Sequence, residues 1–256
     1  MVRRVASQQT KNEIDSQFTF MILEICIDSY ASALAAKNGG ADRLELCSAL
    51  AVGGTTPSSS LVEQCVNELG MPSMMMIRPH DGGFVYSEHD LRTMIGSIEV
   101  AKSIGVQGVV FGVLTSDRKI DLETCRRLLE HCDGLETTFH RAIDVAEDPL
   151  TSLAVVESLG FDRVLTSGQQ RTAIKGADLI RKMVHQSNSI KILAGSGVNA
   201  DSVADLISQT GVREVHASAS NLSSESQTQG DVTFGDGRRV TCETKVAQLK
   251  NSLSDF

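Results

Sequence analysis

Hydrophobic and polar positions follow two alternating periods along most of this chain. Short apolar runs bounded by turn residues recur, and each is followed by a longer segment with apolar residues three and four positions apart. The first pattern is typical of buried parallel strands and the second of amphipathic helices. Strands are predicted at residues 22–27, 42–46, 74–77, 108–111, 136–139, 163–165, 190–193 and 214–216.

Helices are predicted between these strands, and several carry start signals. Ser87 and Asp90 have the spacing of a capping box, and Pro149 suits a first helical position. The helices are expected at residues 30–38, about 58–69, 88–103, 122–132, 149–158, 174–185 and about 199–208.

Eight strand-then-helix units require a parallel sheet with right-handed crossovers. The predicted fold class is therefore α/β, a TIM-like (β/α)8 barrel in a single domain. A doubly wound open sheet is the alternative, but the chain contains no Gly-x-Gly-x-x-Gly fingerprint of that fold.

The two ends of the chain differ in composition from the barrel core expected at residues 21–220. Residues 1–20 are predicted to be a disordered extension. Residues 221–256 read as a polar tail with a final helix, in which Val246, Leu249 and Leu253 form an apolar stripe that packs on the barrel.

Composition restricts the partners and the compartment. The 256 residues carry a net charge of -8 with no basic run, which argues against nucleic acid or an anionic membrane surface as partner. No apolar run is long enough for a membrane helix. Six cysteines are scattered without a Cys-x-x-Cys pair or an export signal, which favours reduced thiols in the cytoplasm, with the nucleus as a further compartment.

The first two predicted strands carry the same Glu-x-Cys pattern, Glu24 with Cys26 and Glu45 with Cys47. Residues two apart on a strand share a face, and buried carboxylates are costly against the outer helices, so both pairs are expected to point inward. If the register matches, the two thiols lie within reach of one soft ion such as Cu(I). The alternative is that both are inert core cysteines.

Charged residues also gather where other strands end. Arg78 follows the third strand, and His140, Arg141 and Asp144 follow the fifth. Loops at the carboxyl ends of barrel strands form the mouth of the fold, so these residues are expected to join Glu24 and Glu45 there as candidate catalytic residues. The charges could neutralise one another, or could orient a small carboxylate or phosphate and move a proton.

Two further loops could bind an anion at the mouth. Gly195-Ser196-Gly197 follows the seventh strand, where barrels often bind phosphate, and Thr166-Ser167 follows the sixth. Glycine in such a loop also serves plain turns, so the pattern alone does not decide between the two roles.

Seven short motifs together resemble the CutC family of copper homeostasis proteins over about residues 21–220. They are Glu24-Ile-Cys26, Gly40-Ala-Asp-Arg-Leu-Glu45-Leu-Cys47, Gly53-Gly54-Thr55-Thr56-Pro57-Ser58, Ile77-Arg78-Pro79, Thr138-Phe139-His140-Arg141-Ala142, Leu165-Thr166-Ser167-Gly168 and Glu214-Val-His216. The resemblance implies a cytosolic TIM-like barrel, assembled into homo-oligomers and associated with copper. It also implies Cys26 and Cys47 as the Cu(I) ligands proposed for animal members.

The chain departs from the family pattern at three places in the mouth. It reads Arg78-Pro79-His80-Asp81-Gly82-Gly83-Phe84 for Arg-Pro-Arg-Gly-Gly-Asp-Phe, Gly195-Ser196-Gly197 for a triple glycine, and Ser220 where an arginine is often found. These changes remove two positive charges from the mouth and leave the thiols intact.

Two functional hypotheses follow. The first is a copper homeostasis protein that binds Cu(I) as its cofactor through the cysteine pair. The alternative is a barrel enzyme that acts on a small anionic metabolite through the Glu, Arg and His cluster. The sequence leaves open whether the protein is an enzyme.

Overall fold

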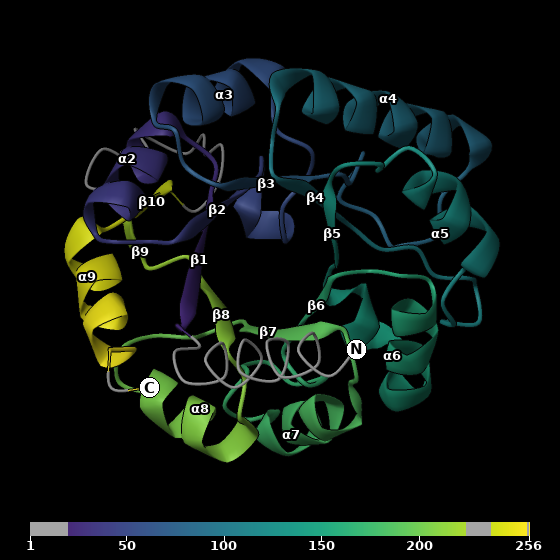
Figure 1. The fold of residues 1–256 in the computed structure, drawn as a ribbon. Coiled ribbons are helices and arrows are strands. Elements are labelled where there is room, and N and C mark those ends of the chain that lie inside the picture. The colour runs from purple at the N-terminus through teal and green to yellow at the C-terminus, as the bar shows by residue number, and fades with distance from the viewer. Residues whose placement is uncertain (1–19, 224–236, 255) are drawn as a thin grey trace, which may run out of the picture.

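A computed structural model describes residues 20–223, 237–254 and 256, and its main sheet is a closed barrel of parallel strands surrounded by helices (Figure 1). Each strand pairs with the next in chain order, and the last pairs with the first. The predicted TIM-like (β/α)8 fold is confirmed. The strands are β1 Ile22–Ile27, β2 Arg43–Leu46, β3 Ser73–Met76, β4 Gly108–Phe111, β5 Glu136–Phe139, β6 Arg163–Thr166, β7 Lys191–Gly195 and β8 Glu214–Ala217.

The helices alternate with the strands. Two begin at their predicted start signals, whereas the helices predicted from 174 and from about 199 begin at Ala177 and Val203. Ser87 and Asp90 form a reciprocal capping box, and Pro149 opens its helix directly after the Asp148 cap. The helices are α2 Tyr30–Asn38, α3 Ser59–Glu63, α4 Glu88–Ile104, α5 Leu122–Leu129, α6 Pro149–Ser158, α7 Ala177–Gln186, α8 Val203–Thr210 and α9 Glu243–Ser252. Short helical turns add η1 Leu50–Val52, η2 Gln64–Glu68 and η3 Arg141–Val145.

The segment after β8 contains an element that the sequence did not predict. Strands β9 Ser220–Leu222 and β10 Arg239–Thr241 form a two-stranded antiparallel sheet. Helix α9 follows, and its residues Val246 and Leu249 are buried, as is Leu253 directly after it. Residues 1–19 of the predicted extension, and residues 224–236 and 255 of the polar tail, lie outside the described residues.

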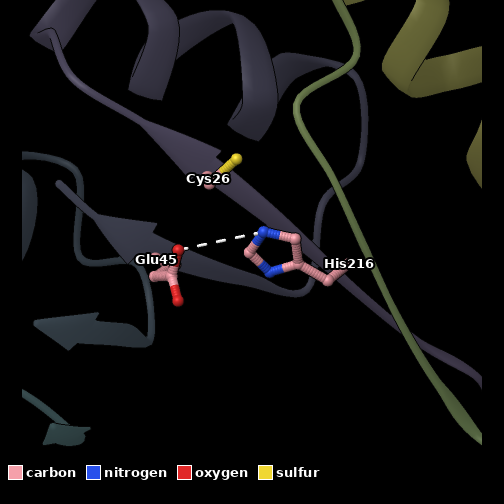
Figure 2. A group of neighbouring side chains, drawn as sticks. All are labelled: Cys26, Glu45 and His216. Atoms are coloured by element: carbon pink, nitrogen blue, oxygen red, sulfur yellow. Dashed lines mark ion pairs between the residues drawn. The ribbon is translucent and has the colours of Figure 1, made fainter. Parts of the chain in front are cut away.

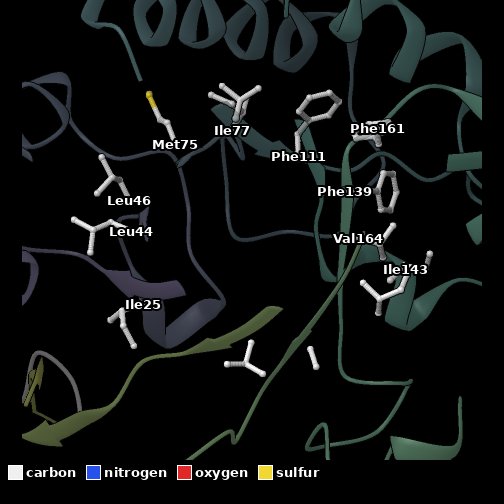
Figure 3. Close-up of a cluster of buried hydrophobic side chains, with 14 of the residues drawn as sticks. Ile25, Leu44, Leu46, Met75, Ile77, Phe111, Phe139, Ile143, Phe161 and Val164 are labelled. Atoms are coloured by element: carbon white, nitrogen blue, oxygen red, sulfur yellow. The ribbon is translucent and has the colours of Figure 1, made fainter. Parts of the chain in front are cut away.

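The hydrophobic core lies between the barrel and its helices. Outward-facing strand residues such as Ile25, Leu44 and Phe111 are fully buried and pack beneath the helical ring (Figure 3). The alternate residues of each strand point into the barrel, where polar and sulfur-containing side chains gather. Among the described residues, none of the helices combines the length and apolar character that crossing a membrane requires.

The register of β1 against β2 determines which inward side chains meet. Glu24 pairs with Arg43, and Cys26 pairs with Glu45. Cys47 therefore lies beyond the level of Cys26, toward the carboxyl end of the barrel. The register match that would set the two thiols side by side is not present in this pairing.

Candidate functional site

The amino-terminal end of the barrel interior is filled by a salt-bridge ladder of five charged residues. Arg43 donates to Glu24 Oε2 at 2.6 Å and to Glu214 Oε2 at 2.7 Å. Arg163 donates through Nε to Glu214 Oε2 at 3.0 Å, and its Nη1 lies 2.9 Å from Glu136 Oε2. Mutual neutralisation of glutamates and arginines was one of the two roles open from the sequence, and here the partners of Glu24 and Glu214 are arginines within the strands.

One level above the ladder, Cys26, Glu45 and His216 converge from β1, β2 and β8 (Figure 2). One potential ligand atom from each residue lies within 4.8 Å of the other two, and all three residues are buried. These atoms are a thiol sulfur, a carboxylate oxygen and an imidazole nitrogen. The three residues are called the sulfur–imidazole group below.

The imidazole of His216 is oriented by Glu24. Its Nδ1 lies 2.8 Å from Glu24 Oε1. Burial would raise the pKa of Glu24, but Arg43 and His216 lower it from 4.5 to about 2, so the carboxylate is ionised and accepts a hydrogen bond from Nδ1–H. His216 Nε2 then faces Glu45 Oε2 at 3.8 Å.

Electrostatics within the group follow from its burial. Burial would lower the pKa of His216, but the adjacent Cys26 and Glu45 raise it well above its ordinary value. Burial raises the pKa of Glu45, an effect that His216 opposes and Glu24 reinforces. Glu45 Oε1 is buried and has no hydrogen-bond partner among the described residues. The group therefore contains an unused oxygen ligand.

Cys47 borders the sulfur–imidazole group without joining it. Its thiol donates to Glu45 Oε2 at 3.4 Å, and its side chain packs in a small apolar cluster with Met74, Met76 and Val110. Burial, reinforced by Glu45, raises the pKa of Cys47 well above its ordinary value. At neutral pH this residue is therefore a neutral thiol that serves Glu45 as a hydrogen-bond donor.

A cavity of about 370 Å³ opens above the group at the carboxyl ends of the strands. Cys26, Glu45 and His216 line it, and so do Arg78, His140, Arg141 and Asp144. Among the predicted catalytic residues, Glu24 does not line this mouth cavity, because its carboxylate is engaged in the ladder below. Whether any of these residues takes part in catalysis stays a prediction.

Arg78 and His140 occupy adjoining parts of the cavity wall. Arg78 donates its four Nη hydrogens to the carbonyls of Val52, Gly54, Asp81 and Gly82. His140 Nδ1 accepts from the Ala142 N–H at 3.3 Å. Burial and the Arg78 charge lower the pKa of His140 to about 3, so the ring is neutral and carries its proton on Nε2.

Asp144 holds the loops after β5 and β6 together. It accepts from Arg141 Nε at 2.8 Å, from Thr166 Oγ1 at 2.6 Å and from the Ser167 N–H and hydroxyl. The hydroxyls of Thr166 and Ser167 are thus engaged, and neither residue lines the cavity.

The loop after β7 reaches the cavity only in part. Ser196 and Gly197 line it, with φ angles of 81° and 69°, whereas Gly195 is the last residue of β7 and does not. Anion binding by the five predicted residues stays a prediction.

Sequence analysis missed His216, Arg43, Arg163 and Glu214 as site or supporting residues. The available signal was the two-residue period: Arg43 shares the face of Glu45, and Glu214 shares that of His216. Their meeting with Glu24 required the closure of β8 onto β1, which pairs Glu24 with His216.

Comparison with known proteins agrees with this architecture. The model of the CutC family matches residues 21–221. A CutC family protein from Pasteurella multocida is 47% identical over 199 residues, covering 77% of this chain and 82% of the relative. The human copper homeostasis protein cutC homolog is 38% identical over 222 residues, covering 86% of this chain and 81% of that protein.

A solved structure shows the same likeness in three dimensions. The crystal structure of a CutC protein from Streptococcus agalactiae superposes with a TM-score of 0.74 at 33% identity. The superposition covers 78% of this chain and 99% of the bacterial chain.

Proposed function

This chain belongs to the CutC family, and we propose that it contributes to copper homeostasis by binding Cu(I) at the floor of the mouth cavity. The observation that carries the proposal is the convergence of Cys26, Glu45 and His216 ligand atoms within 4.8 Å. The human and mouse relatives bear the name copper homeostasis protein, which supports the choice of metal.

The donor atoms suit a soft monovalent copper ion. A thiolate selects Cu(I), and the imidazole nitrogen of His216 is also a good ligand for copper once the ion has displaced its proton. His216 directs Nε2 toward Glu45 while Nδ1 is held by Glu24, the arrangement in which a carboxylate orients a metal-binding histidine. Cys26 and His216 are therefore the proposed ligands, and Glu45 borders the ion.

Cys47 is the second thiol of the cysteine pair suggested by the sequence. Its hydrogen bond to Glu45 keeps it next to the sulfur–imidazole group, and it could join Cys26 as a ligand only by leaving that bond. We propose that Cys26 contributes more to Cu(I) affinity than Cys47 does.

A competition experiment tests the proposal. The reduced, metal-free protein is titrated anaerobically against a chromophoric Cu(I) chelator, and the retained copper is measured by absorbance. Cys26→Ser and His216→Gln are each expected to lower Cu(I) affinity by about 100-fold or more, because each removes a direct ligand. Cys47→Ser is expected to have the smaller effect.

Cys242→Ser provides the matched control, because this thiol is half-buried and outside the barrel interior. Equal and complete loss in Cys26→Ser and Cys47→Ser would identify the cysteine pair as the site in place of Cys26 and His216. Unchanged Cu(I) affinity in a Cys26→Ser, His216→Gln double variant would show that copper does not bind in this cavity.

A further inference from the structure

We propose that the mouth cavity also binds the carboxylate of a small organic acid, held by Arg78 and His140 above the sulfur–imidazole group. The inference goes beyond copper binding and uses different residues. It rests on a buried cation without an ion-pair partner, on an unused hydrogen-bond donor beside it and on an apolar cavity wall.

Arg78 supplies the uncompensated charge. Its side chain is buried, with 6% of the residue exposed, and all four of its hydrogen bonds go to neutral backbone carbonyls. The other charged groups of the cavity are paired, Arg141 with Asp144 at 2.8 Å and His216 with Glu45 at 3.8 Å. Among the described residues no carboxylate forms an ion pair with Arg78, so an anionic ligand would complete the charge balance.

His140 supplies a free donor beside this charge. His140 Nε2 is buried without a hydrogen-bond partner in the described part of the chain, whereas the Arg78 side chain also interacts with the buried hydroxyl of Tyr86. His140 is 3% exposed, and its Nδ1 is occupied by the Ala142 N–H, which leaves Nε2–H as its free donor. The His140 N–H can donate to one oxygen of a carboxylate, and the single charge of Arg78, which packs on the same Phe84 ring, balances one negative charge; a phosphate would need more donors than this wall offers.

The Phe84 ring packs against both Arg78 and His140. Its ring packs edge-on against His140 at a centroid distance of 4.8 Å and lies 5.3 Å from the Arg78 guanidinium carbon. Because the Arg78 and His140 nitrogens are shielded from solvent, we expect this half-buried ring to turn aside as the carboxylate enters.

The remaining wall determines the kind of acid. Leu50, Val52, Met76, Phe84, Val145 and Leu165 line the cavity. An apolar wall favours a ligand with a hydrocarbon body over an inorganic ion. The cavity of about 370 Å³ is of the size that small-molecule sites occupy.

The first measurement is made on the full-length, metal-free protein by calorimetric titration with acetate, butanoate, hexanoate and inorganic phosphate. Affinity is expected to rise from acetate to hexanoate, by about threefold or more per added methylene, because each buried CH₂ contributes about 0.8 kcal/mol. Phosphate is expected to bind more weakly than butanoate. Absence of hexanoate binding at millimolar concentration, or tighter binding of phosphate, would overturn the proposal.

A pair of variants tests the role of His140. Gln places an amide N–H near the position of Nε2, whereas Asn preserves an acceptor near Nδ1 and lacks the outer donor. His140→Asn is expected to weaken hexanoate binding about tenfold or more, the loss of one charge-assisted hydrogen bond, while His140→Gln retains most of the affinity. His131→Gln, at a half-buried histidine that is paired with Glu99 and lies outside the cavity, is the control.

Equal affinities in the Asn and Gln variants, with thermal melting unchanged, would show that Nε2 is not the donor and would refute the assignment. Both copper ligands are untouched in these variants. Failure of carboxylate binding is therefore distinguishable from failure of copper binding.

Discussion

Replacement of Glu24 by Gln tests the salt-bridge ladder beneath the cavity. The Glu24 carboxylate is 1% exposed and accepts from Arg43 at 2.6 Å and from His216 at 2.8 Å. Burial would raise its pKa, but Arg43 and His216 lower it from 4.5 to about 2. At about 1.4 kcal/mol per pH unit, this depression corresponds to about 3 kcal/mol of folding stability at pH 7. The variant is expected to lose about that amount.

The dependence on pH provides a second signature. Because the folded-state pKa of Glu24 is depressed, its contribution is complete above pH 4.5 and is lost as the pH falls toward 2. Urea unfolding followed by circular dichroism at pH 7 and at pH 3 measures the gap between wild type and variant. A gap below about 1 kcal/mol at pH 7, or one that stays constant down to pH 3, would refute the reasoning.

Glu88→Gln is the matched control for this substitution. Glu88 also forms an ion pair, with both of its oxygens bonded to Arg127 at 2.8 and 3.0 Å, but its side chain is 70% exposed. Solvent screens such a pair, so the free energy of unfolding is expected to change little. Comparison of the two variants separates the effect of burial on the free energy of unfolding from the effect of the salt bridge itself.

Two further predictions concern packing and thiol reactivity. Gly108→Ala is expected to lower the free energy of unfolding by about 1–3 kcal/mol in urea titrations, because the added methyl group would collide with the Glu136 backbone carbonyl of the neighbouring strand; a neutral effect would contradict that packing. In the native protein at pH 8, a chromogenic disulfide is expected to label Cys242 fastest, and Cys242→Ser should remove the fast phase. Burial raises the pKa of the thiols that should react only on unfolding, Cys47, Cys65, Cys125 and Cys132.

Local patterns were sufficient to predict the barrel. Strand β1 and helices α2 and α6 have the predicted bounds, and the Ser87–Asp90 capping box is present. Each of these features depends on residues close together in the sequence, such as an apolar run or a cap and its partner three positions later. The β9–β10 pair was not predicted, because its strands are short and polar.

The candidate site depended on information that local patterns do not contain. The Glu-x-Cys repeats indicated which residues face inward, but the stagger of a barrel sets the register between strands. That stagger pairs Cys26 with Glu45. Closure of the barrel then brings His216 to Glu24 across a separation of 192 positions. His216, the last residue of the predicted strand 214–216, gave no separate sign of this contact.

The salt-bridge ladder and the proposed carboxylate site lie at different levels of the barrel interior. The Glu24 variant can therefore test copper binding and carboxylate binding separately. Glu24 belongs to the ladder and also orients His216, whereas Arg78 and His140 are fixed by backbone groups near the carboxyl ends of the strands. Glu24→Gln should therefore lower Cu(I) affinity about tenfold or more, the usual cost of altering a group that orients a metal-binding histidine. Hexanoate affinity should remain unchanged in the same protein. A parallel loss of both affinities would mean that the variant distorts the whole mouth cavity, and that the ladder controls the shape of the site instead of the orientation of a single imidazole.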